Sequence, residues 1–288
     1  MARRRDARRP PYRLDPSPLG SGAFAKVTRG VHRDDRHVAA VKEAFDHPRF
    51  ITRLEREIKV QRQISHPNVM PVIHASPEHL WYSMPLADTD LHAFRESSDW
   101  DPGHLGTILL ETWRGLTAAH AIGHVHRDVT PRNILRVGER CVVSDFGLVT
   151  KGDRESLASL TRAGAELGTT GFIAPEVLRD PRAASPASDL FSLGVIASWA
   201  MTGTWPKEGS LLVLPKDPDW ADFVRRAVAT QPLERLSAAG WLLERERAEA
   251  AEAWHRERNA CFFCGSLQGF FGPSLQCFSC KVPNVAGY

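Results

Sequence analysis

The chain has 288 residues, of which 42% are hydrophobic and 25% are charged, and its formal net charge is +3. This is the composition of an ordinary globular protein with one large domain or two smaller ones, and it excludes intrinsic disorder as the main state. Five arginines in the first nine residues leave the remainder close to neutral, so the charge does not imply nucleic-acid binding. No run approaches the roughly 18 apolar residues of a membrane span, and no apolar segment follows the basic start as a secretory signal requires. We therefore expect a cytoplasmic protein.

The first third of the chain alternates short β-type runs with one helix. Residues 1–17 hold the arginine run and three prolines and are expected to form a disordered basic tail. Val38–Lys42 is typical of a buried strand, except for its final lysine. Between Thr52 and Ile64 apolar residues recur at helical spacing, and Pro67 marks a point that this helix cannot pass.

From residue 105 onward the pattern is mainly helical. Apolar residues mark one face of a helix over residues 105–119, and further helices are predicted over residues 190–201 and 220–229. Two short β-type runs, residues 134–135 and 141–143, lie between them. From residue 242 to 258 the chain is rich in Glu, Arg and Ala, which favours an exposed helix, and we assign residues 246–258 as a helical linker.

A glycine-rich segment, residues 19–27, lies between two β-type runs. Glycines allow backbone amides to approach phosphate oxygens closely, although a plain hairpin turn explains such a segment equally well. Lys42 follows 15 residues later in an otherwise apolar strand, where a lysine is costly unless it is paired. Glu57, on the following helix, is a suitable partner.

Three further motifs follow in order. The first is His126-Arg-Asp-Val-Thr-Pro-Arg-Asn133, the second is Asp145-Phe-Gly147, and the third is Gly168-Thr-Thr-Gly-Phe-Ile-Ala-Pro-Glu176. Short pieces of each motif occur by chance in many proteins. All three motifs in this order and at this spacing do not.

Together these motifs resemble those of eukaryotic-type (Hanks-type) protein kinases, over about residues 19–243. The resemblance implies an α+β, bilobal protein-kinase fold over residues 18–245, with a β-rich N-lobe at about residues 18–86 and a helical C-lobe at about residues 87–245. It also implies ATP and Mg²⁺ (or Mn²⁺) as cofactors and proteins as substrates.

The resemblance assigns a role to each motif residue. Lys42 would hold the α- and β-phosphates of ATP and would itself be held by Glu57. Asp145 would bind Mg²⁺, and Asn133 would bind a second ion. Asp128 would orient the acceptor hydroxyl and take its proton.

Other residues would surround the nucleotide. Met84 would lie at the back of the adenine pocket, and the hinge would follow directly. The predicted ATP-binding residues, besides Lys42 and Asp145, are Leu19, Gly20, Ser21, Gly22, Ala23, Phe24, Val27, Ala40, Met84, Leu86 and Leu135.

Two positions bear on the acceptor. Serine/threonine kinases usually have a lysine where this chain has Thr130, and tyrosine kinases have an arginine at the position of Arg132. Because Arg132 can meet the phosphate from there, we include it among the catalytic residues. Residues 168–172 resemble the serine/threonine form of the substrate-binding loop, so we predict Ser/Thr acceptors. The alternative is a nucleotide-binding pseudokinase scaffold that recruits partners through its C-terminal module.

Further features bear on regulation and architecture. Arg127 precedes Asp128, and kinases of this type commonly pair that arginine with a phosphate on the activation segment. Gln61 stands where the family usually has an apolar residue, so we expect looser packing there. By resemblance, Glu176 and Arg235 form a buried ion pair, and Asp189 ties its helix to the catalytic loop. The candidate phosphosites are Ser159, Thr161 and Thr170.

The cysteines predict a metal site. Cys261 and Cys264 form one Cys-x-x-Cys pair and Cys277 and Cys280 another, a spacing typical of a structural zinc site, with redox cysteines or an iron–sulfur site as alternatives. Residues 259–288 are therefore expected to form a small four-cysteine zinc ribbon or knuckle that binds Zn²⁺ and is available to a protein partner. Cys141, in a β-type run, is expected to be buried.

Overall fold

The computed structural model describes residues 9–76, 78, 80–147, 169–245 and 247. The chain divides into two compact units, residues 1–240 and 241–288, and the elements named below belong to the first. In the second unit, residues 241–245 and 247 are helical, as the composition predicts, and the rest of the predicted linker lies outside the described residues. None of the described helices combines the length and apolar character needed to cross a membrane.

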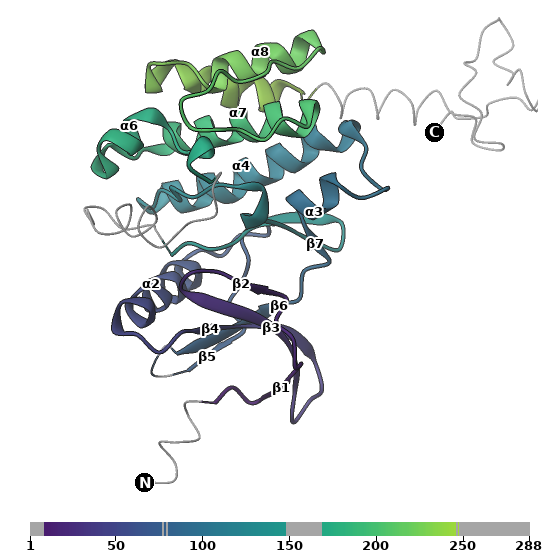
Figure 1. The fold of residues 1–288 in the computed structure, drawn as a ribbon, viewed down its shortest axis with the longest axis vertical. Coiled ribbons are helices and arrows are strands. Elements are labelled where there is room, and N and C mark those ends of the chain that lie inside the picture. The colour runs from purple at the N-terminus through teal and green to yellow at the C-terminus, as the bar shows by residue number, and fades with distance from the viewer. Residues whose placement is uncertain (1–8, 77, 79, 148–168, 246, 248–288) are drawn as a thin grey trace, which may run out of the picture. The chain divides into compact units, whose positions relative to one another are not determined.

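One antiparallel sheet dominates the N-terminal part of the first unit, up to Pro85 (Figure 1). Its strand order is β1-β3-β4-β6-β5, and β2 pairs with β3 as a hairpin. The predicted strand over Val38–Lys42 is confirmed and continues to Ala44. The strands are β1 (Tyr12–Leu14), β2 (Gly20–Ser21), β3 (Ala25–His32), β4 (Val38–Ala44), β5 (His74–Ala75) and β6 (Trp81–Pro85).

Strand β1 corrects the expectation of a disordered tail over residues 1–17. Tyr12 is only 2% exposed and pairs with His32 of β3, so the ordered sheet begins inside that segment. The reason is the Tyr12 side chain, whose ring packs with Ala39, Val41 and Trp81. A three-residue strand among prolines and arginines has too little periodicity to be recognised from the sequence.

Helix α2 (Pro48–Gln63) packs against the sheet and begins one turn earlier than the spacing predicts. Pro48 occupies its first turn, where the missing N–H costs nothing, and the ring of His47 accepts a hydrogen bond from the Arg49 N–H. Its buried face carries Leu54 and Ile58 together with two polar residues, Glu57 and Gln61. A polar residue on a buried helical face needs a partner, so Glu57 and Gln61 direct attention to the contacts that each of them makes.

The remainder of the unit is mainly helical and includes a small three-stranded sheet (Figure 1). The strands are β7 (Thr89–Asp90), β8 (Ile134–Val137) and β9 (Arg140–Val143), and the α-helices are α3 (Leu91–Arg95), α4 (Leu105–Ala121), α6 (Pro175–Arg179), α7 (Pro186–Thr202) and α8 (Pro218–Ala227). Short 3₁₀ segments are η1 (Pro102–His104), η2 (Pro131–Asn133), η3 (Thr169–Phe172), η4 (Pro181–Ala183) and η5 (Pro232–Arg235).

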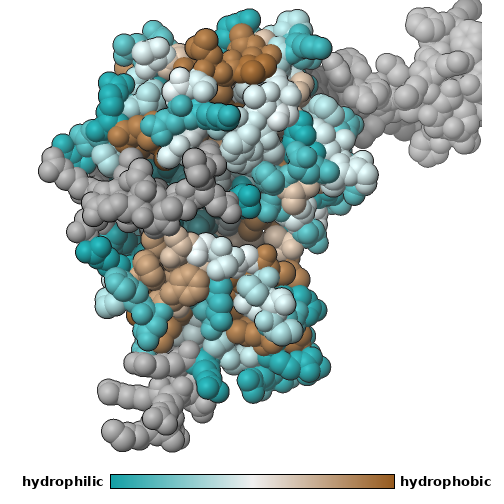
Figure 2. Space-filling model, in the orientation of Figure 1, coloured by the Kyte–Doolittle hydropathy of each residue, from teal (hydrophilic) through white to brown (hydrophobic). Residues whose placement is uncertain are grey.

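Helix α7 forms the centre of this helical part. It is buried on nearly every side, which explains why its sequence is apolar without a clear polar face. Ser185 and Ser188 form a capping box at its start, and Gly203 ends it with φ 74°, a conformation that favours glycine. The visible surface in Figure 2 is mostly hydrophilic or neutral, with scattered hydrophobic patches, so the main apolar cores lie inside.

Candidate active site

The first feature of the site is an ion pair between the sheet and helix α2. The Lys42 Nζ atom donates to both carboxylate oxygens of Glu57, at 2.7 and 2.9 Å. The Glu57 side chain is 1% exposed and that of Lys42 is 12% exposed. The pairing predicted from the cost of a buried lysine is therefore confirmed, and it joins α2 to β4.

Asp145, which follows β9, places a second carboxylate beside Lys42. Its Oδ2 atom lies 3.2 Å from Lys42 Nζ, and its Oδ1 lies 3.8 Å from an Arg53 nitrogen. Asp145 has φ 64°, an unusual value for a residue with a side chain, which indicates that the surrounding contacts hold it in place. Burial alone would raise the pKa of Asp145, but the positive charges of Lys42, Arg53 and His126 outweigh it and lower that pKa well below its usual range.

The charge of Lys42 is secured in the same way. Burial alone would lower its pKa, but the carboxylates of Asp145 and Glu57 outweigh burial and raise it. The lysine therefore remains a cation at neutral pH, with two anions facing it. Such an ammonium group, held in a fixed position, is suited to binding phosphate oxygens.

The segment from His126 to Asn133 is held by the buried start of α7. Asp189 is fully buried, and its two carboxylate oxygens accept hydrogen bonds from the main-chain N–H groups of His126 and Arg127, both at 2.9 Å. The ring of His126 lies 2.9 Å from the Ser144 carbonyl oxygen and packs edge-on against Phe146. These contacts confirm the structural role predicted for Asp189.

Asp128 and Asn133 lie together at the end of this segment. The Asn133 Nδ2 atom donates to the Asp128 carbonyl oxygen at 2.8 Å and lies 3.5 Å from its carboxylate. Burial raises the pKa of Asp128, and the nearby Asp145 carboxylate raises it further. Thr130 is buried and Arg132 is exposed on η2, so the two residues that bear on acceptor choice differ in their access to solvent.

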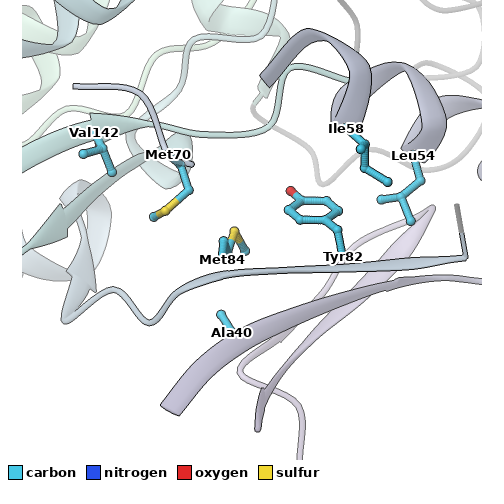
Figure 3. Packing of buried hydrophobic residues seen from close by; sticks show 7 residues of the cluster. All are labelled: Ala40, Leu54, Ile58, Met70, Tyr82, Met84 and Val142. Atoms are coloured by element: carbon cyan, nitrogen blue, oxygen red, sulfur yellow. The ribbon is translucent and has the colours of Figure 1, made fainter. Parts of the chain in front are cut away.

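The residues predicted to surround adenine also come together. Val27, Leu86 and Leu135 pack against a buried cluster that contains Ala40 and Met84. The cluster contains residues from both parts of the unit, because Val142 of β9 packs with Ala40 and Met84 of the large sheet (Figure 3). The glycine-rich segment is a hairpin in which Gly20 pairs with Val27, and its residues Leu19 to Ala23 are exposed, while Phe24 at its end is half-buried.

A second buried ion pair anchors the C-terminal motif. Arg235 is fully buried, and it donates to both carboxylate oxygens of Glu176 at 2.7 and 3.0 Å. It also donates to the carbonyl oxygens of Ala229 and Ala187. The predicted pair is confirmed. Thr170 is half-buried in η3, whereas Ser159, Thr161 and the four clustered cysteines lie outside the described residues.

Two residues of the site were missed by sequence reasoning. Tyr82 of β6, 1% exposed, donates from its hydroxyl to Glu57 Oε1 at 2.7 Å. In Figure 3 its ring lies beneath α2, beside Leu54 and Ile58. Arg53 lies one helical turn before Glu57, and its guanidinium is 4.1 Å from the centre of the Phe24 ring. Helical spacing could have placed Arg53 beside Glu57, but no sequence signal pairs Tyr82 with that carboxylate.

Gln61 occupies its buried position with half of its amide satisfied. Its Nε2 atom donates to the Met70 carbonyl oxygen at 2.9 Å, whereas its buried Oε1 atom has no hydrogen-bond partner in the described part of the chain. An unsatisfied buried oxygen costs about 1–3 kcal/mol. The position therefore carries a local cost, whereas the looser packing expected from the sequence stays a prediction.

Comparison with known proteins agrees with this geometry. Residues 15–212, more than half of the chain, match the family model described as a protein kinase domain. The chain is 31% identical over 201 residues to human calcium/calmodulin-dependent protein kinase type 1B, covering 65% of this chain and 56% of that protein. It is 32% identical over 196 residues to the mitogen-activated protein kinase spk1 of Schizosaccharomyces pombe, covering 62% of this chain and 50% of that protein.

The matches therefore span about half the length of these relatives. The family-model match, residues 15–212, includes Lys42, Glu57, Asp128 and Asp145, and the structure brings Glu57 and Asp145 together around Lys42. On the family match and the bilobal arrangement of a sheet-rich and a helical part, the chain belongs to the protein kinase domain family.

Proposed function

We propose that this chain is an ATP-dependent protein kinase that transfers the γ-phosphoryl group to Ser and Thr hydroxyls of proteins. The observation that carries the proposal is the closed network in which Lys42 contacts both Glu57 and Asp145. Phosphoryl transfer requires mainly positioning and charge neutralisation, and this network supplies a fixed cation next to a fixed anion.

Lys42 would bind the phosphates of ATP, and Glu57 and Tyr82 would keep it in position through the hydrogen bonds described above. Asp145 and Asn133 would hold Mg²⁺ or Mn²⁺, because carboxylate and amide oxygens are the ligands these ions prefer. The Asn133 Nδ2 atom is already bonded to Asp128, so the oxygen of the amide is the end suited to a cation. Bound Mg²⁺ neutralises charge that develops on the phosphates.

Asp128 would orient the acceptor hydroxyl and remove its proton. A general base works best when its pKa approaches the working pH, and burial together with Asp145 shifts the pKa of Asp128 in that direction. Arg132, exposed on η2, would supply a cation to the phosphate in place of the lysine that Thr130 replaces. The likeness of residues 168–172 to the serine/threonine form supports Ser and Thr as acceptors.

The test is incubation of the purified chain with γ-³²P-ATP, Mg²⁺ and a generic protein substrate, followed by phosphoamino-acid analysis. We expect phosphoserine and phosphothreonine from wild type and at least a roughly 100-fold lower rate from Asp128→Asn, because removal of a general base typically costs that much. Asp101→Asn, at an exposed position that caps η1, is the matched control and should keep full activity.

The outcomes separate the candidate functions. Phosphotyrosine alone would contradict Ser/Thr specificity and make Arg132 the better guide to the acceptor. Equal rates from wild type and Asp128→Asn would contradict the assigned base. Retained ATP binding without any transfer in wild type would favour the pseudokinase scaffold.

We also propose that the chain phosphorylates its own activation segment, at Ser159, Thr161 or Thr170. The support is Arg127, whose position before Asp128 is the one from which kinases of this type pair with such a phosphate. Phosphopeptide mapping after incubation with ATP tests this, with Asp128→Asn as the control that should carry no added phosphate. Absence of phosphate from all three residues in active wild type would contradict the proposal.

For residues 259–288 we propose a structural Zn²⁺ site made by Cys261, Cys264, Cys277 and Cys280, which serves to recruit a partner or substrate. The support is the spacing of the two Cys-x-x-Cys pairs, whose four thiolates suit a closed tetrahedral site. Metal analysis should find about one zinc ion held by these residues and its loss from a Cys277→Ala, Cys280→Ala double variant. Unchanged zinc content in that variant would contradict the assignment.

A further inference from the structure

Three metal-binding side chains converge on the hairpin between β3 and β4, on a part of the sheet that the proposed reaction does not use. They are His32, at the end of β3, Asp35 in the turn, and His37 just before β4. Their ligand atoms all lie within 4.8 Å of one another. The Asp35 Oδ1 atom is 2.6 Å from Nδ1 of His37 and 3.0 Å from Nδ1 of His32.

His32 shows that this cluster is incompletely satisfied by the protein alone. The residue is only 9% exposed, and its Nδ1 atom is buried. Among the described residues that atom has no hydrogen-bond partner, although it lies 3.0 Å from the Asp35 Oδ1 atom as an ion-pair contact. A buried ring nitrogen without a hydrogen bond costs free energy, and this one lies within 4.8 Å of the ligand atoms of Asp35 and His37.

The second nitrogen of His37 is held in the way that metal-binding histidines usually are. Its Nε2 atom lies 2.9 Å from the Tyr12 hydroxyl, which donates in turn to the Ser83 hydroxyl at 2.9 Å. Such an outer hydrogen bond fixes the orientation of the ring, and a metal ion at Nδ1 would replace the proton that this atom donates to the Asp35 carboxylate at 2.6 Å. His37 also stacks on His32 with ring centres 4.8 Å apart, which keeps the two rings next to each other.

We propose that His32, Asp35 and His37 bind a divalent transition-metal ion, with Zn²⁺ as the representative of the class. Two imidazoles and one carboxylate suit Zn²⁺, Co²⁺ or Ni²⁺, and three protein ligands leave room for a water molecule in a tetrahedral site. Ligand atoms in such a site lie about 3.3 Å apart, given metal–ligand distances of about 2.0–2.1 Å. The two contacts to Asp35 would therefore lengthen slightly, and its side chain, 61% exposed on the turn, has the freedom to move.

The ion would join elements that are distant in the sequence. His32 and His37 close the β3–β4 hairpin, and through Tyr12 and Ser83 the site continues to β1 and β6. Binding to the folded state alone raises stability by mass action, so the ion should raise the Tm of the N-lobe. The site is independent of phosphoryl transfer, because none of its three ligands belongs to the proposed catalytic set.

The experiment uses the full chain with the Cys277→Ala, Cys280→Ala substitutions, so that zinc held by the C-terminal cysteines is not counted. Metal-free protein is dialysed against a buffered low concentration of free Zn²⁺, and bound zinc and Tm are measured. We expect about one zinc ion per chain and a Tm that rises with zinc. Both effects should be lost in Asp35→Asn and in His37→Gln, which keep side chains able to make the hydrogen bonds of the turn and of Tyr12.

Two matched variants serve as controls. Asp34→Asn removes a neighbouring carboxylate from the same hairpin, and His104→Gln removes a histidine from the other lobe, so both should bind zinc and shift in Tm like the parent. Substitution by Co²⁺ should give visible bands without the thiolate charge-transfer absorption that cysteine ligands produce. Absence of zinc from the parent protein, or equal zinc content in the parent and the two ligand variants, would overturn the proposal.

Discussion

The Tyr82→Phe substitution isolates one hydrogen bond to the charged centre of the site. The Tyr82 hydroxyl donates to Glu57 Oε1 at 2.7 Å, and both residues are 1% exposed. A hydrogen bond to a charged group contributes about 1.5–3 kcal/mol to stability. Phenylalanine retains the ring that packs with Leu54, Ile58 and Met84, so no cavity larger than one hydroxyl is created. We therefore expect the free energy of unfolding to fall by about 1.5–3 kcal/mol.

Equilibrium urea unfolding, followed by tryptophan fluorescence, measures this loss. A double-mutant cycle with Glu57→Gln tests its cause, because the amide oxygen of glutamine still accepts the hydrogen bond but carries no charge. In that background Tyr82→Phe should cost only about 0.5–1.5 kcal/mol, the usual range for neutral partners. Equal costs in both backgrounds, or a loss below about 0.5 kcal/mol in wild type, would refute the reasoning.

Three further predictions concern buried polar groups. Arg235→Leu should lower the free energy of unfolding, measured in urea, by about 3–5 kcal/mol, because it leaves the Glu176 carboxylate without its partner. Adding Glu176→Gln to that variant should recover part of the loss. Burial raises the pKa of Glu176, but the Arg235 hydrogen bond and charge outweigh it and lower that pKa below its ordinary value of 4.5. This pair should therefore contribute fully above that pH and less as pH falls through the folded pKa, a slope that Glu176→Gln should reduce. Gln61→Glu should destabilise more than Gln61→Met in the same assay, because an ionised carboxylate cannot donate to the Met70 carbonyl oxygen.

Much of the candidate site was predictable because each motif residue sits in a local context that restricts it. Lys42 follows four apolar residues in its strand and Glu57 lies on the apolar face of a helix, so the cost of burying either charge alone predicts that they meet. The spacing of His126, Asp128 and Asn133 likewise places them in one short segment. Burial cost and motif spacing are local properties, and a single sequence contains them.

Partners that come from distant segments were not predictable in this way. Tyr82 reaches Glu57 across 25 positions, and His37 reaches Tyr12 across another 25. Neither pair carries a pattern, because a tyrosine in an apolar strand is equally consistent with plain packing. Likewise, β1 is identified as a strand only by its pairing with β3, in which Tyr12 lies opposite His32.

The amino-acid sequence by itself determined the kinase family, the order of its motifs and which charged residues had to be paired. The tertiary structure alone decided that Arg53 and Tyr82 complete the network around Glu57 and Asp145, and that three ligands gather on the β3–β4 hairpin. The physical reason is that hydrogen bonds and metal ligation depend on distances of about 3 Å or less. Such distances are set by the pairing register of strands and by the packing of a helix on a sheet, and neither is written in the spacing of residues along the chain.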